Sequence, residues 1–123
     1  MLNHEHAFPS SKRLLKPVEF RHAFGTGTRI RCSAFTIDAT LNNFEHPRLG
    51  LAISRRAVAR AVDRNRIKRV VRESFRSNAS TIGSLDIVVR AAPTARTQSN
   101  ALLSRKLNDL WRKIKNNTQN ILT

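Results

Sequence analysis

A dense run of arginine residues marks the middle of the chain. Between positions 55 and 76, acidic side chains occur only at Asp63 and Glu73, while the cationic ones are Arg55, Arg56, Arg60, Arg64, Arg66, Lys68, Arg69, Arg72 and Arg76. The planar guanidinium group binds two phosphate oxygens at once and stacks on nucleobases. A merely solvated helix face would instead carry mixed charges in Glu–Lys pairs. The run therefore predicts binding to the phosphates of a nucleic acid.

Groups that could catalyse a reaction are sparse by comparison. The acidic residues stand singly, without the D-x-D or D-x-E pair typical of a two-metal site. His4 and His6 could form an acid–base pair in principle, but surface histidines are the simpler interpretation. Cys32 has no partner at metal-ligand spacing. We therefore predict no catalytic residue, no metal site and no cofactor in the protein itself.

The composition supports a polyanionic partner. The chain has 123 residues, 40% of them hydrophobic, and 23 Lys and Arg against 8 Asp and Glu give a net charge of +15. So large an excess repels itself in a compact fold, and phosphate binding offsets that repulsion by releasing counterions. No apolar run reaches the ~18 residues that a membrane helix needs, and we expect no secretory signal. We expect a cytoplasmic protein that has no membrane contact.

The elements that position these side chains follow from the hydrophobic pattern. Pro17 starts a short helix through Phe24, and residues 28–41 form a strand region that could be split in two. A second strand is expected over 49–53 and a third over 85–89. Residues 77–83 resemble a turn, a last helix covers about 99–117, and the tail from 118 is expected to fray.

The basic run lies on a helix of its own, over about residues 62–76. At ~100° per residue its apolar side forms one arc: Ile67, Val70, Val71, Ser74 and Phe75. The order α-β-β-α-β-α predicts an α/β (α+β) two-layer sandwich whose β-α-β crossover carries the basic helix. We expect a single RNA-binding domain over 1–123, ordered over about 8–115 with flexible ends.

The basic helix also carries a family signature. The run Arg64-Asn65-Arg66-Ile67-Lys68-Arg69, with Arg72 one turn later, resembles the Arg-Asn-Arg signature of the protein subunit of bacterial ribonuclease P. Pro47-Arg48-Leu49-Gly50-Leu51 stands at the family's usual distance before it, as does Arg13-Leu14-Leu15 followed by Phe20 and Phe24. The resemblance extends from Phe8 to Lys115.

The resemblance implies a function that composition alone does not. Family members bind a catalytic RNA, which hydrolyses precursor tRNA with Mg²⁺ and removes its 5′ leader, and no further protein partner is required. By that resemblance, contacts to the catalytic RNA would come from Arg64, Asn65, Arg66, Lys68, Arg69 and Arg72. Further phosphate contacts are expected from Arg13, Arg55, Arg56, Arg60 and Arg76.

The family's leader-binding cleft would be lined by aromatic residues. Phe20 and Phe24 resemble its aromatic wall, and Phe35 on the first strand would add to it, although such a phenylalanine is more often a core residue. Many relatives have a tyrosine on the cleft side of that strand, whereas this chain has none and Asp38 stands in that place. We expect weaker base stacking, with Asp38 facing a hydrated cation or lying at the surface.

Three other functions remain open at this point. A ribosomal protein would need the basic helix but no cleft for single strands. A DNA-binding regulator would need a positioning helix before the basic helix, where a strand is expected instead. An autonomous nuclease would cleave precursor tRNA without any RNA subunit.

Overall fold

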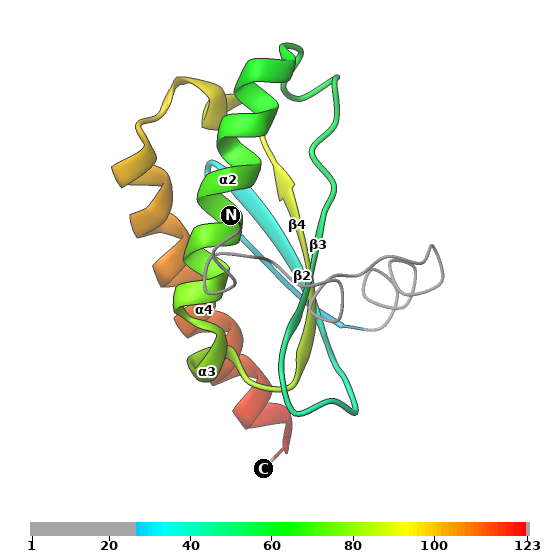
Figure 1. The fold of residues 1–123 in the computed structure, drawn as a ribbon. Coiled ribbons are helices and arrows are strands. Elements are labelled where there is room, and N and C mark those ends of the chain that lie inside the picture. Colours follow the sequence, from blue (N-terminus) through cyan, green and yellow to red (C-terminus); the bar gives the residue numbers. More distant parts are fainter. Residues whose placement is uncertain (1–26, 123) are drawn as a thin grey trace, which may run out of the picture.

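The computed structural model describes residues 27–122 and forms two layers (Figure 1). In chain order the elements are β1 (Thr28–Arg31), β2 (Phe35–Leu41), β3 (Arg48–Leu51), α2 (Ala61–Ser77), α3 (Ala79–Ile82), β4 (Leu85–Ala91), the 3₁₀-helix η2 (Pro93–Thr97) and α4 (Asn100–Leu122). The first expected helix, together with Arg13, Phe20 and Phe24, lies outside these residues. The mixed α+β class is confirmed, and the predicted order is confirmed in part: the strands and the two long helices follow it from β1 onward, while α3 and η2 were not predicted.

The four strands form one sheet in the order β1-β2-β4-β3. Only β3 and β4 are parallel, which is the arrangement that the β-α-β crossover through α2 requires. β1–β2 and β2–β4 pair antiparallel. The helices cover one face of the sheet (Figure 1), so each strand turns alternate side chains toward them and toward the opposite face. We call the opposite face the open face because no described helix packs on it, although its central residues Asp38, Asp86 and Val88 are buried.

The core fills the space between the sheet and the helices. All five residues of the predicted apolar arc of α2 are buried, so the 3.6-residue period identified the correct side of the helix. The predicted stripe of α4 is buried as well: Leu103, Leu107, Leu110, Trp111 and Ile114. From the sheet, alternate residues of β2 and β4 enter this core, among them Phe35, Ile37 and Ile87.

Several element bounds differ from the prediction. The split of residues 28–41 into two strands is confirmed, with a bend before Phe35. The expected turn over 77–83 contains the short helix α3, because the buried side chain of Ile82 anchors this segment to the core. Gly83 ends α3 with φ of 80°, a conformation that favours glycine. Helix α4 continues to Leu122 rather than ending near residue 117.

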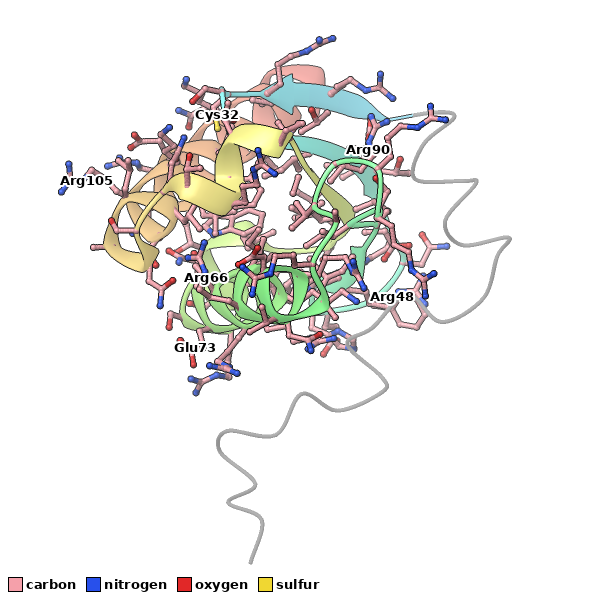
Figure 2. The ribbon with its side chains drawn as sticks, turned by 90° about the horizontal axis from the view of Figure 1, so that it is seen from above. Cys32, Arg48, Arg66, Glu73, Arg90 and Arg105 are labelled. Atoms are coloured by element: carbon pink, nitrogen blue, oxygen red, sulfur yellow. The ribbon has the colours of Figure 1, made fainter. Side chains whose placement is uncertain are left out.

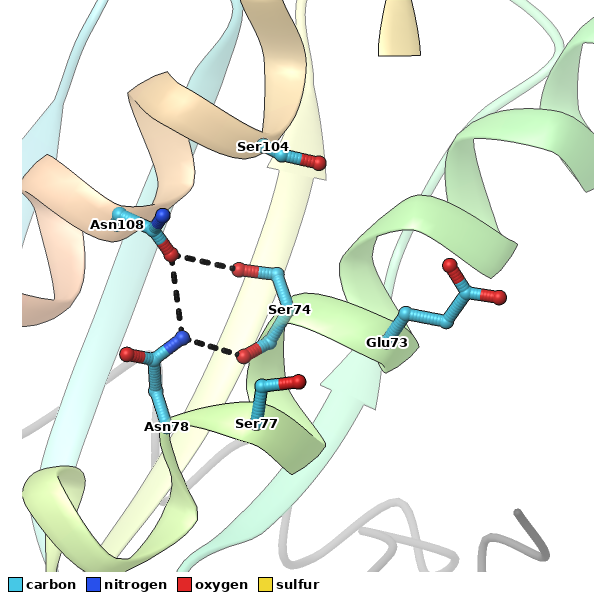
Figure 3. Close-up of a pocket in the computed structure, with 6 residues that line it drawn as sticks. All are labelled: Glu73, Ser74, Ser77, Asn78, Ser104 and Asn108. Carbon is cyan, nitrogen blue, oxygen red and sulfur yellow. Dashed lines mark hydrogen bonds between the residues drawn. The ribbon is translucent and has the colours of Figure 1, made fainter. Parts of the chain in front are cut away.

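A polar seam fixes α2 against α4. The indole Nε1 of Trp111 donates to Ser74 Oγ at 2.9 Å, and Ser74 Oγ donates in turn to Asn108 Oδ1 at 3.3 Å. Asn78 Nδ2 donates to the Ser74 carbonyl and to Asn108 Oδ1. These bonds lie at a polar hollow of about 450 Å³, which Glu73, Ser77 and Ser104 also line (Figure 3).

Replacing Ser74 by alanine is expected to destabilise the fold by about 1–2 kcal/mol. The reason is that the buried indole N–H of Trp111 would lose its acceptor, and an unsatisfied buried donor costs about that much. Urea unfolding would measure the change. Ser77→Ala, an exposed neighbour in the same hollow, should be close to neutral and serves as the control.

Candidate nucleic-acid interface

Helix α2 presents a continuous polar stripe on the side away from the core. Its exposed members are Asn65, Arg69, Arg72 and Arg76, with Lys68 half-buried beside them. Successive members are three or four positions apart, so their side chains project from one side of the helix. We call Asn65, Arg69, Arg72 and Arg76 the α2 stripe. Its spacing suits a groove or a run of phosphates more than a single ion.

Arg66, although part of the predicted signature, turns from α2 toward the start of α4 (Figure 2). Its guanidinium donates to Asn100 Oδ1 at 2.6 Å and to the Gln98 carbonyl at 3.2 Å. A further bond reaches the Arg96 carbonyl at 3.1 Å. Arg66 thereby ties α2 to the end of η2 and the start of α4, which makes it a positioning residue in this structure.

Arg64 makes similar contacts in the other direction along the chain. It donates to the carbonyls of Val58 and Ala59, at 3.0 and 2.7 Å. Val58 is fully buried, so these bonds anchor the loop of residues 52–60 to the first turn of α2. The loop carries the exposed residues Arg55, Arg56 and Arg60. Three predicted phosphate ligands are therefore held near the helix N-terminus, where the helix dipole also favours anions.

The different settings of Arg66 and Arg69 lead to a paired prediction. Arg66→Gln should lower the free energy of unfolding by about 1–3 kcal/mol, because three charge-assisted hydrogen bonds are lost. Arg69→Gln should leave stability within about 0.5 kcal/mol and weaken RNA binding. Thermal or urea unfolding and an RNA-binding titration on both variants check this. Equal stability of the two variants would contradict the positioning role.

The open face of the sheet carries a second cationic group. Asp38 lies at its centre and is only 3% exposed. Its Oδ1 accepts from Arg29 Nε at 2.7 Å and its Oδ2 from Arg90 at 3.1 Å. The expectation of a surface residue is therefore wrong, and two guanidinium groups stand where a hydrated cation was expected. Asp38 organises arginines from β1 and β4 on one face.

Phe35 is not on that face. Period-two alternation places it on the opposite side of β2 from Asp38, and its side chain is fully buried in the core. A base could not stack on it without unfolding the core. The assignment of Phe35 to a leader cleft is thus corrected: it is a core residue. Phe20 and Phe24 stay predictions, since they lie outside the described residues.

A third cluster lies at the β3 edge of the open face. Asp86, 3% exposed, accepts from Arg48 Nε at 2.8 Å and from its terminal nitrogen at 2.6 Å. Asp86 Oδ1 also accepts from Asn42 Nδ2 at 2.9 Å. Figure 2 shows Arg48 and Arg90 on the side of the molecule opposite to Arg105 of α4. Arginines from three strands thus border the open face.

Within residues 27–122 no cluster of three or more His, Cys, Asp or Glu side chains could hold a metal ion. Over the same span, no helix has the length and apolarity to cross a membrane. Directly before α2 come β3 and the loop of residues 52–60, where a DNA-binding helix-turn-helix would place its first helix.

Comparison with known proteins decides the family. The family model described as Ribonuclease P matches residues 8–115, nearly the whole chain. The chain belongs to the ribonuclease P protein family. This membership assigns it a role in tRNA processing, as the protein subunit of that enzyme, and so as part of an endoribonuclease.

Individual relatives agree with the assignment. The Ribonuclease P protein component of Methylococcus capsulatus is 48% identical over 106 residues, covering 86% of this chain and 83% of the relative. That of Nitrosococcus oceani is 44% identical over 104 residues, covering 85% and 87%.

Solved ribonuclease P proteins share the fold. A 2.0 Å structure of the RNase P protein of Staphylococcus aureus superposes with a TM-score of 0.77 at 28% identity, covering 82% of this chain and 93% of the other. The RNase P protein of Thermotoga maritima gives a TM-score of 0.74 at 28% identity, covering 83% and 96%.

Arg29 and Arg90 are not among the residues that we predicted for the site. A signal for Arg29 exists in the sequence: Thr28 and Ile30 alternate with Arg29 and Arg31, which places both arginines of β1 on the open face once β1 pairs with β2. Arg90 offers no comparable signal, because its role depends on the alignment of β4 with β2.

Proposed function

We propose that this ribonuclease P protein binds the catalytic RNA through α2 and the 5′ leader of precursor tRNA along the open face. The RNA subunit performs the Mg²⁺-dependent hydrolysis, and the protein contributes no catalytic residue or cofactor. The pair acts in the cytosol and requires no other protein partner. In this proposal the phosphate contacts are divided between two faces of the molecule.

The observation that carries the proposal is the α2 stripe. Arg69, Arg72 and Arg76 share one exposed side of a helix whose opposite side is fully buried. Guanidinium groups spaced along one exposed side of a helix can each contact a successive phosphate of an RNA backbone. Asn65 adds a polar side chain to the row, and Lys68 borders it. Arg64 and Arg66 support the same surface by fixing the helix to its neighbours.

The leader is proposed to follow the arginines of the open face. Asp38 holds Arg29 and Arg90 in place, which lowers the entropy that these side chains would lose on binding a phosphate. A face built from guanidinium groups contacts the backbone, so it accepts leaders of different sequence. Phe20 and Phe24 are expected to add base stacking to these charge contacts.

Two physical effects would then assist the reaction. Cationic side chains between two RNA backbones screen their repulsion, which lowers the Mg²⁺ concentration needed for activity. Contacts made only with the leader bind precursor more tightly than product, so they favour turnover of the substrate over inhibition by mature tRNA.

Leader-dependent binding tests this division of roles. In the holoenzyme, Arg29→Gln should weaken binding of a precursor with a leader by about 5- to 10-fold, and leave mature tRNA unaffected. Lys113→Gln, on the exposed side of α4, is the matched control and should change neither affinity. Equal weakening for both tRNAs, or for neither, would contradict leader binding on the open face and favour a purely structural, ribosomal-type role.

A further inference from the structure

The loop between β2 and β3, residues 42–47, exposes an aromatic ring. Phe44 is 46% exposed, while the aromatic rings Phe35, Phe75 and Trp111 are fully buried in the core. An exposed phenylalanine alone carries little meaning. Here, however, the ring has two specific neighbours. The guanidinium carbon of Arg48 lies 4.4 Å from its centroid, and the His46 ring lies at 5.7 Å with a tilt of 31°.

The loop that carries Phe44 is held by two hydrogen bonds of the Asn42 side chain. Asn42 Oδ1 accepts from the Phe44 backbone N–H at 2.9 Å, and Asn42 Nδ2 donates to the His46 carbonyl at 3.3 Å. The same Asn42 nitrogen donates to buried Asp86, which also holds Arg48 by two bonds. One buried carboxylate therefore positions the cation beside the ring and the side chain that shapes the loop. The ring is presented in a fixed place before any ligand arrives.

The electrostatic setting indicates which ligand fits. Arg48 borders the open face on which Arg29 and Arg90 lie around Asp38. An aromatic ring beside a row of guanidinium groups is the arrangement that binds unpaired nucleotides, with the base on the ring and the phosphates on the cations. A single ring does not form the contiguous apolar patch that a protein partner or a membrane would need. The net charge of +15 also favours a polyanion.

We propose that Phe44, assisted by His46 and Arg48, is a stacking site for one unpaired base of bound RNA. The proposal rests on the proposed function only for the identity of the RNA. If that function holds, the base belongs either to the 5′ leader or to an unpaired nucleotide of the catalytic RNA. In both cases a purine or pyrimidine ring lies on the exposed face of Phe44. This site provides stacking beside Arg48, at the border of the open face, in a chain that lacks tyrosine.

The test uses the full chain and a short single-stranded RNA carrying 2-aminopurine, titrated by fluorescence. Phe44→Ala should weaken binding by about 5- to 100-fold, Phe44→Leu by nearly as much, and Phe44→Trp should preserve it. Leu41→Ala removes a side chain of similar exposure just before the loop and should have little effect. Circular dichroism and a melting curve confirm that each variant is folded.

The same RNA with its bases removed separates stacking from charge. The Phe44→Ala effect should vanish with the abasic RNA, because the phosphate contacts remain and there is no base to stack. Unchanged affinity of Phe44→Ala for the normal RNA would overturn the proposal, and so would an equal loss with the abasic RNA.

Two further affinity measurements identify which RNA supplies the base. A loss of affinity for precursor tRNA that depends on the leader assigns the base to the leader, and a loss of affinity for the catalytic RNA alone assigns it to that RNA. Either loss supports the site. A Phe44-dependent loss on the short RNA would stand even if the protein failed to assist cleavage, so failure of the site and failure of the proposed function are distinguishable.

Discussion

Reversing the charge at Arg69 and Arg72 is expected to weaken binding of the catalytic RNA by about 100-fold or more at near-physiological salt. Both side chains are exposed, one turn apart on the α2 stripe. The double variant Arg69→Glu/Arg72→Glu removes two phosphate contacts and adds two repulsive charges. The slope of log affinity against log salt should fall by about 2, since fewer counterions are released. Filter binding over a salt series measures both quantities.

A second double variant with the same change in net charge tests whether the effect is specific to the α2 stripe. Arg105 and Lys113 are exposed on α4, and Arg105 lies on the far side of the molecule from Arg48 (Figure 2). Arg105→Glu/Lys113→Glu should weaken binding much less, because only the long-range field is altered. Equal losses in the two double variants would mean that net charge, and not the α2 stripe, determines the affinity.

Asp86→Ala is expected to lower the free energy of unfolding by about 3–5 kcal/mol, the largest stability effect that we predict. The side chains of Asp86 and Arg48 are 4% and 13% exposed, so removing the carboxylate leaves a guanidinium that is largely withdrawn from water. Asn42 loses a bond as well. Urea unfolding followed by circular dichroism measures the change.

Two further variants test the cause of that loss. Asp109→Ala breaks an exposed ion pair with Arg112 and should cost less than about 1 kcal/mol. The double variant Arg48→Met/Asp86→Leu should recover much of the stability lost in Asp86→Ala, because no charge is left unpaired in the interior. A double variant as unstable as Asp86→Ala would show that the loss does not come from an uncompensated charge.

The sequence predicted the regular elements well where one period dominated. The apolar arc of α2 and the stripe of α4 were identified correctly because each side of a long amphipathic helix has a single environment. In the strand over residues 35–41, period-two alternation puts Phe35 on the same side as Ile37 and Ala39, apart from Asp38. The assignment of Phe35 to the cleft conflicted with that alternation, and the buried ring confirms the alternation.

The site could be predicted only in part, because its details depend on contacts between distant segments. The sequence placed Arg66 on the basic helix, but its bonds reach Arg96, Gln98 and Asn100, at and just after the end of the 3₁₀-helix η2, which no pattern indicated. Asp38 and Asp86 likewise obtain their arginine partners through strand pairing. Phe44 lies in the loop of residues 42–47, where its backbone is bonded to Asn42, which in turn is bonded to Asp86, 44 residues away in the sequence.

Cleavage of a 5′-extended precursor tRNA at low Mg²⁺ tests the central claim most directly. The reaction would be run with the cognate catalytic RNA alone, with this protein alone, and with both together. We predict that only the combination forms the mature 5′ end efficiently, and that the protein alone is inert. If the protein adds nothing to the RNA, or cleaves precursor without it, the proposed division of labour between the two subunits is contradicted.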